Sequence, residues 1–183
     1  LGPYNNGGNG GAGISGADSR TAVSDAIDWC RAQLTAAELD FLASFEPGFA
    51  LSLSSGRRLT LYHGTPSSNT TNLLPELPIE QFDQLLGAQR SDVMAGGHTH
   101  VQMLRQHRGT LVVNPGSVGA PFREYPIAGP PVIMPHAEYA SLDIYPEQIS
   151  INLHRVALDR QIMRSAILAS SNPLAPALLA PYA

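Results

Sequence analysis

Apolar residues at intervals of three or four positions predict two helices near the start of the chain. One apolar face of a helix over about residues 20–34 is formed by Val23, Ile27, Cys30 and Leu34. The stretch TAAE at residues 35–38 has the spacing of a capping box and opens a second helix to about residue 45, with Leu39 and Leu42 facing inward. We expect a helical hairpin packed on a sheet, with Cys30 as a buried core thiol.

Alternating apolar and polar residues predict strands through the middle of the chain. The segment FALSLSSGRRLTLYHG at residues 49–64 has the pattern of two strands joined by a turn. A short helix is expected near residues 79–86, and SDVMAGG at residues 91–97 is typical of a buried strand. Four further strand candidates follow as VQMLRQ, TLVVNPGS, EYASLDIY and ISINLHRV. Residues 121–135 hold too many prolines for a strand and predict an inserted loop, and a last helix is expected over about residues 158–170.

These patterns divide the chain of 183 residues into three parts. Residues 1–19 are rich in glycine and asparagine and predict a loop or disordered segment. Residues 20–171 are expected to form one domain of strands flanked by helices, and residues 172–183 a tail rich in Ala, Pro and Leu. An apolar fraction of 43% and a charged fraction of 14% are typical of a globular protein.

Charge and composition narrow the classes of function. The chain has 11 basic residues, all arginine, and 15 acidic residues, so nonspecific binding to a nucleic-acid backbone has no electrostatic driving force. No apolar run reaches the roughly 20 residues that span a bilayer, and the first residues lack the pattern of a signal peptide. We therefore expect a cytoplasmic protein without a membrane segment. Cys30 is the single cysteine, which excludes an internal disulfide and a cysteine-based zinc site.

Three histidines follow predicted strands and are candidates for one metal site. His63 comes after the strand LTLY, and His98 and His100 lie in GGHTH at the end of a predicted strand. Ligands of open α/β sheets bind outside the carboxyl ends of the strands, and residues i and i+2 of a strand point to one face. These imidazoles can therefore converge on one metal or on two adjacent ones. The alternative is a hydrogen-bonded structural role. We expect a structural or surface role for the other three histidines, His107, His136 and His154.

Three motifs occur in a recognisable order: LYHGTP at residues 61–66, GGHTH at residues 96–100 and NPGSVG at residues 114–119, followed by EYASLDI and HRVALD. This order resembles the second half of calcineurin-like metallophosphoesterases, in particular the small bacterial and archaeal phosphodiesterase-type members. The helices DAIDWCRAQLTAAELDFL resemble the segment after the third motif of that subgroup, and the likeness covers nearly all of residues 20–170. It implies an α+β or α/β fold, a four-layer sandwich of two mixed β-sheets flanked by helices, here without its first β-α-β units.

The resemblance also implies roles for individual residues. His63 and His98 would bind the second of two divalent transition metals, and His100 would bind the first. Manganese, iron, zinc and nickel all suit mixed imidazole and carboxylate ligands. The implied reaction is hydrolysis of a small phosphate ester, a monoester or a diester, by a metal-activated water. No catalytic acid or base is identified in this chain.

Asn114, Ser117 and Arg123 are candidates for contact with the substrate. The turn from Asn114 to Ser117 would lie near the metals, where its side chains or backbone N–H groups can orient ligands or phosphate oxygens. The alternative is a purely structural Pro-Gly turn. Arg123, on the following loop, either forms a bidentate contact with a phosphate or is a solvated arginine.

Departures from the family pattern leave two explanations open. The Asp-x-His, Gly-Asp and Gly-Asn-His-Asp motifs of the family are absent from these 183 residues, and with them the bridging carboxylate. Asn9, in the stretch GNGG, is the nearest remnant of a metal-binding asparagine. Either the chain is the remainder of a longer enzyme, with exposed strand edges that favour a homo-oligomer, or it is a diverged member that lost these motifs. The alternative function is a catalytically inactive scaffold that binds another protein.

Overall fold

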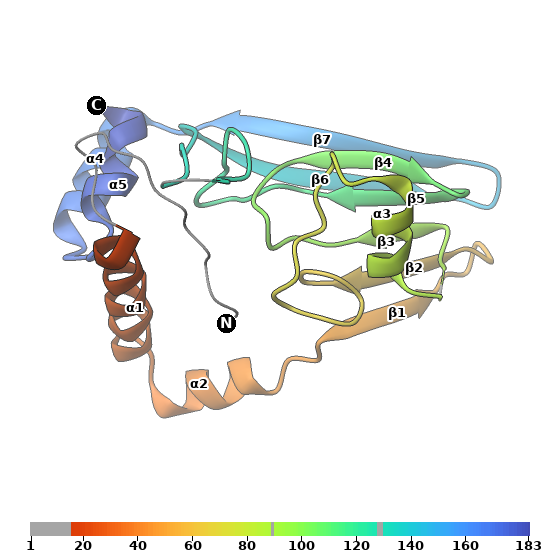
Figure 1. Ribbon diagram of the computed structural model, residues 1–183, viewed down its shortest axis with the longest axis horizontal. Coiled ribbons are helices and arrows are strands. Elements are labelled where there is room, and N and C mark those ends of the chain that lie inside the picture. The colour runs from red at the N-terminus through yellow and green to blue at the C-terminus, as the bar shows by residue number, and fades with distance from the viewer. Residues whose placement is uncertain (1–15, 89, 128–129) are drawn as a thin grey trace.

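The computed structural model of the protein describes residues 16–88, 90–127 and 130–183, with side chains from residue 22 onward. The helices within these residues are α1 (Gly16–Ala32), α2 (Ala36–Ala43), α3 (Ile79–Leu86), α4 (Arg160–Ala169), α5 (Ala175–Leu179) and a 3-10 helix (Ala180–Tyr182). The strands are β1 (Gly48–Ser52), β2 (Arg58–Tyr62), β3 (Val93–Ala95), β4 (Met103–His107), β5 (Thr110–Asn114), β6 (His136–Ile144) and β7 (Ile149–Ala157). Figure 1 shows the strands gathered in one half of the molecule and α1, α2, α4 and α5 in the other.

The larger sheet has five strands in the order β1-β2-β3-β5-β4. Strands β2, β3 and β5 are parallel, and the edge strands β1 and β4 pair with them antiparallel. Because Leu61 pairs with Ala95 in the β2–β3 register, the two strands end side by side at the same edge of the sheet. The residues that follow them, His63 and the GGHTH segment, therefore emerge together.

Helix α3 covers one face of this sheet. Its residues Phe82 and Leu86, one helical turn apart, are fully buried and pack in a core with Tyr62, Leu73, Met94, Met103 and Val112. Burial of a large apolar side chain stabilises a fold by about 1.5–3 kcal/mol. The guanidinium of Arg105 on β4 lies 4.0 Å from the centre of the Phe82 ring, which adds a cation–π contact.

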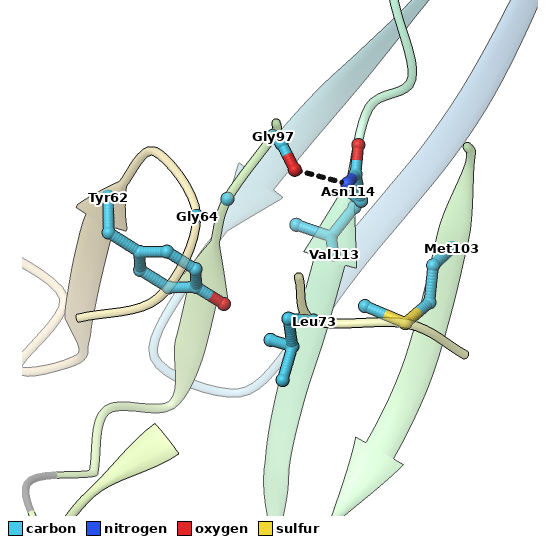
Figure 2. A pocket seen from close by; sticks show the side chains of 8 residues that line it. Tyr62, Gly64, Leu73, Gly97, Met103, Val113 and Asn114 are labelled. Carbon is cyan, nitrogen blue, oxygen red and sulfur yellow. Dashed lines mark hydrogen bonds between the residues drawn. The ribbon is translucent and has the colours of Figure 1, made fainter. Parts of the chain in front are cut away.

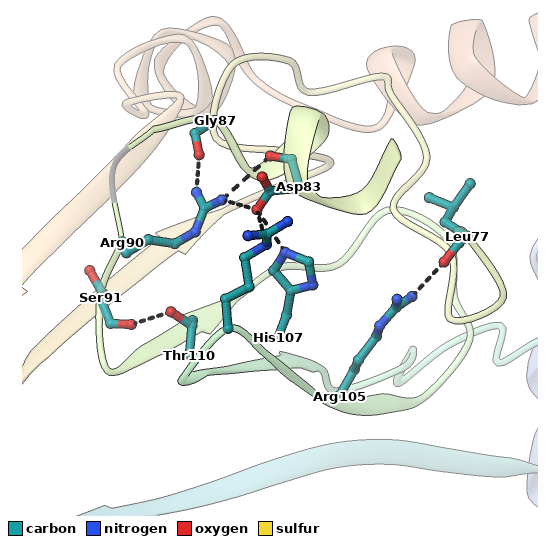
Figure 3. Close-up of polar contacts among 9 residues, drawn as sticks. Leu77, Asp83, Gly87, Arg90, Ser91, Arg105, His107 and Thr110 are labelled. Atoms are coloured by element: carbon teal, nitrogen blue, oxygen red, sulfur yellow. Dashed lines mark hydrogen bonds and ion pairs between the residues drawn. The ribbon is translucent and has the colours of Figure 1, made fainter. Parts of the chain in front are cut away.

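A polar cluster ties the carboxyl end of α3 to the β4–β5 turn. Oδ1 of Asp83 accepts from Nε2 of buried His107 at 2.8 Å and from Nη2 of Arg90 at 2.6 Å, and Nε of Arg108 lies 3.3 Å away (Figure 3). Arg90 also donates to the carbonyl of Gly87, which caps the helix. These contacts lower the pKa of Asp83, with the His107 hydrogen bond as the largest cause. His107 therefore has the structural role expected from the sequence.

The second sheet is the antiparallel hairpin β6–β7, which runs alongside β4 and β5 (Figure 1). Gln102, just after GGHTH, joins the two sheets because its Nε2 donates to the carbonyl of His154 at 3.1 Å and to that of Pro115 at 3.2 Å. The predicted α+β class with two sheets and flanking helices is confirmed; the five-stranded sheet is mixed and the hairpin is antiparallel. None of the described helices is both long and apolar enough to cross a membrane.

The expected packing of the first two helices is wrong. Among the described residues, α1 and α2 extend away from the sheet (Figure 1), and Val23, Ile27 and Leu42 are 50%, 42% and 46% exposed. Cys30 is also exposed, not a buried core thiol. The capping box at Thr35 and Glu38 is present as predicted, with Thr35 N–H donating to the Glu38 carboxylate at 2.7 Å. Helical periodicity identifies an apolar face, but the element that covers that face is set by tertiary packing.

Both ends of the described chain contain more helix than expected. Helix α1 begins at Gly16, so residues 16–19 are helical. Residues 175–182, expected to be tail, form α5 and the 3-10 helix, and Tyr182 is buried. Arg164 of α4 donates to the carbonyl of Tyr182 at 3.1 Å, which holds the end of the chain against α4.

Candidate metal centre

The GGHTH segment is held by backbone hydrogen bonds to β5 and to the residue that follows β2. Gly96 N–H donates to the carbonyl of Val113 at 2.9 Å, and Gly97 N–H donates to that of His63 at 2.7 Å. His98 and His100 both have a left-handed backbone, with φ of 66° and 58°. Non-glycine residues adopt this conformation uncommonly and at an energetic cost, and such residues cluster at functional sites.

The structure brings His63 and His98 into direct contact. Nε2 of His63 lies 3.3 Å from Nδ1 of His98, with the ring centroids 5.1 Å apart. Two imidazole nitrogens that bind one cation at about 2.1 Å lie about 3.0–3.4 Å apart in octahedral or tetrahedral geometry. The observed separation fits such a shared cation, and without one it permits a hydrogen bond between the rings.

The surroundings of His98 favour its neutral form. Burial lowers the pKa of His98, the neighbouring imidazoles of His63 and His100 lower it further, and a hydrogen bond with the backbone of Thr70 opposes them. A metal binds the neutral imidazole, so the environment prepares this ring for a cation.

His100 is oriented by a backbone carbonyl. Its Nδ1 donates to the carbonyl oxygen of Ala120 at 2.8 Å, and its ring packs against Phe122 with centroids 4.7 Å apart. The proton on Nδ1 leaves the lone pair on Nε2 available for a metal. Metal-binding histidines commonly have such a partner on the other nitrogen.

Asn114, at the end of β5, is buried and fixes the GGHTH turn. Its Nδ2 donates to the carbonyl of Gly97 at 2.7 Å (Figure 2). The same Nδ2 donates to Oγ1 of Thr99 at 3.0 Å. Its Oδ1 accepts from the N–H of Gly116 at 2.9 Å. Both ends of the amide are engaged, so Asn114 holds the histidine segment in place, which agrees with the ligand-orienting role considered from the sequence. A contact between Asn114 and the substrate stays a prediction.

The other two predicted substrate residues do not contact the histidines in the structure. Oγ of Ser117 accepts from the N–H of Ala120 at 3.1 Å, and so supports the residue that orients His100. The Arg123 side chain is 59% exposed and pairs with Glu124 at 3.2 Å. Asn9 lies outside the described residues.

Comparison with known proteins identifies the family. Residues 17–129 match the family model of the calcineurin-like phosphoesterase superfamily domain. The chain belongs to this superfamily. Among curated proteins, no sequence matches the chain significantly.

Two solved structures share the fold. A metallophosphoesterase from Sphaerobacter thermophilus is 20% identical, with a TM-score of 0.61 over 84% of this chain. A hypothetical protein from Pyrococcus horikoshii OT3 is 17% identical, with a TM-score of 0.59 over 77% of this chain. The chain spans 65% of the first protein and 51% of the second. At these identities the likeness establishes the fold.

Members of the superfamily generally use divalent metals, and the donor set found here fits such a cation in part. His63 and His98 supply two converging nitrogens for a cation. In the described parts of the chain, no group of three or more His, Cys, Asp or Glu side chains is arranged to hold a metal. The two nitrogens alone do not complete a coordination sphere.

Tyr62, which packs against the segment that carries His98, was not identified from the sequence. The ring of Tyr62 is buried against the backbone of Gly96, where any Cβ would overlap it. Its hydroxyl points among Leu73, Met103 and Val113 beside a cavity too small for water (Figure 2), and burial raises its pKa. The absence of a side chain at Gly96 makes room for this ring. The only signal in the sequence was an aromatic residue directly before His63.

Proposed function

We propose that the protein hydrolyses a small phosphate ester, a monoester or a diester, at a divalent metal centre to which His63 and His98 contribute. The observation that supports this most directly is the 3.3 Å separation of their ring nitrogens at the shared edge of β2 and β3. Superfamily membership supports the reaction class. The sequence resemblance supports two metals, chosen from manganese, iron, zinc and nickel, with His100 on the other metal.

The residues of the chain would prepare this centre in three ways. His63 and His98 would hold one cation between them, His98 as the neutral imidazole that its surroundings favour. The Ala120 carbonyl keeps the proton of His100 on Nδ1, so that Nε2 is free to bind. Asn114 holds the GGHTH segment in place through its hydrogen bond to the carbonyl of Gly97. When bound, divalent cations lower the pKa of a water and stabilise the charge that develops on the phosphoryl oxygens.

The test compares the full-length protein with its His98→Ala variant. We expect the wild type to contain a transition metal by elemental analysis and to hydrolyse bis(4-nitrophenyl) phosphate, and the variant to lose metal and at least about 100-fold in activity. His154→Ala is the matched control, because His154 is an imidazole on β7 that hydrogen-bonds Ser141 at 2.9 Å. Equal metal content and turnover in wild type and His98→Ala contradict the proposal.

A wild-type protein without metal or activity would favour the alternative predicted from the sequence, an inactive scaffold that binds another protein. The substrate roles of Asn114, Ser117 and Arg123, the ligand role of Asn9 and the boundaries of the domain at residues 20–171 stay predictions. So do a cytoplasmic location and a homo-oligomer; light scattering of the full-length protein tests the last.

A further inference from the structure

A groove of about 460 Å³ opens beside the histidine pair. It lies between the α2–β1 connection and β2. Its walls include four apolar side chains that are between 38% and 60% exposed, namely Leu42, Phe45, Phe49 and Leu61. Clusters of exposed large apolar side chains in a concave surface are typical of binding sites, and this volume is in the range of small-molecule pockets.

The polar residues of the groove lie towards the candidate metal centre. His63 lines the groove, and Nε2 of the same ring meets His98. Asn69, on the loop after His63, is a second polar wall residue. The groove is thus continuous with the histidine pair, which makes one site with a polar end and an apolar end.

The charge of the groove restricts what it can hold. Glu46 is the charged residue among its lining residues, and no arginine lines it. A carboxylate without a basic partner in the wall repels a chain of phosphates or another polyanion. Aromatic walls instead favour an uncharged aromatic or aliphatic group, through burial and ring contacts.

We propose that this groove binds the organic substituent of the substrate and selects phosphate esters with an uncharged aromatic or large apolar group. The inference rests on the proposed function, because it places the phosphoryl group at the His63 end. Phe45 and Phe49 are the residues that determine this selectivity.

The first experiment measures selectivity between two diesters with the same leaving group, bis(4-nitrophenyl) phosphate and methyl 4-nitrophenyl phosphate. For the full-length protein, we expect Phe45→Ala and Phe49→Ala each to lower the ratio of kcat/KM for the aryl diester over the methyl diester by roughly tenfold, mainly through KM. Ile162→Ala on α4 is the matched control, because Ile162 is an exposed apolar residue outside the groove. A ratio that stays the same in both phenylalanine variants overturns the inference and leaves the hydrolase proposal standing.

The second experiment measures binding without turnover, so that the two proposals can fail separately. We expect 1-naphthylphosphonate to bind the full-length protein in isothermal titration calorimetry, with affinity reduced roughly tenfold by Phe45→Ala and Phe49→Ala. This result in a protein without metal or turnover supports the groove and rejects the hydrolase. No binding, or a Phe45→Ala variant that changes from dimer to monomer in light scattering, overturns the groove, because another segment or a second copy then covers it.

Discussion

Nε2 of His63 and Nδ1 of His98 lie 3.3 Å apart although 35 positions separate the two residues in the sequence. The parallel pairing of β2 with β3 brings them together, because the strands end at the same edge and each histidine follows its strand closely. The geometry of the candidate site thus depends on backbone register and on the side chains that hold the two loops.

Asn114→Ala should weaken metal binding without changing a possible ligand. The variant loses the hydrogen bonds to Gly97, Thr99 and Gly116, and the loop that carries His98 and His100 becomes free to move. We expect metal affinity to fall about 10- to 100-fold and stability to fall by about 1–3 kcal/mol. Mn²⁺ titration calorimetry and urea denaturation measure the two effects. Asn152→Ala, an exposed asparagine on β7, is the control and should change neither.

Ser117→Ala distinguishes a role in orienting His100 from a role in binding substrate. The hydroxyl supports Ala120, whose carbonyl orients His100. We therefore expect a loss of metal affinity of several-fold with KM unchanged at saturating metal. Ser150→Ala on β7 is the control. A raised KM with unchanged metal affinity would instead support the direct substrate contact predicted from the sequence.

Gly96→Ala should destabilise the fold through a clash with Tyr62. The new methyl group would overlap the Tyr62 ring, which is buried. Overpacking of this kind costs about 1–3 kcal/mol. Gly119→Ala is the matched control, since its methyl group meets nothing within 4 Å, and its change in stability should stay within about 0.5 kcal/mol. Equal unfolding free energies for the two variants would contradict the packing described here.

The Asp83 cluster should make stability depend on acid pH. Hydrogen bonds from His107 and Arg90 lower the pKa of Asp83 below its ordinary value of 3.8. A carboxylate with a lowered pKa stabilises the folded state above its unfolded pKa, and this contribution is lost as the pH falls through the folded pKa. Wild type should therefore exceed Asp83→Asn in unfolding free energy at pH 6, and the difference should shrink below about pH 4. Asp143→Asn, on an exposed position of β6, is the control.

The sequence predicted the strands, the short helix α3 and the meeting of His63 with His98, because each follows from local periodicity and from the rule for parallel strand ends. It did not predict how α1 and α2 pack. Their apolar spacing is real, but spacing alone does not say which element covers an apolar face. In the structure, Val23 and Ile27 are exposed.

The contacts of Asn114 and Gly96 were also beyond the sequence. For Asn114 the sequence offered a role in orienting ligands or phosphate oxygens, or a purely structural turn, without naming the groups that its amide contacts. Their contacts with Gly97, Thr99 and Tyr62 come from segments distant in the chain, and only the folded structure brings these together. The hydrogen bond from His100 to the carbonyl of Ala120 was equally beyond the sequence, because 20 positions separate the two residues.

Asn114 belongs to β5, a central strand of the larger sheet, and it clamps the histidine loop to that strand. The loop should therefore share the slow amide exchange of the sheet interior and should melt together with it. We therefore expect solutes to reach the histidine pair from the side on which His63 is exposed, without displacement of this loop.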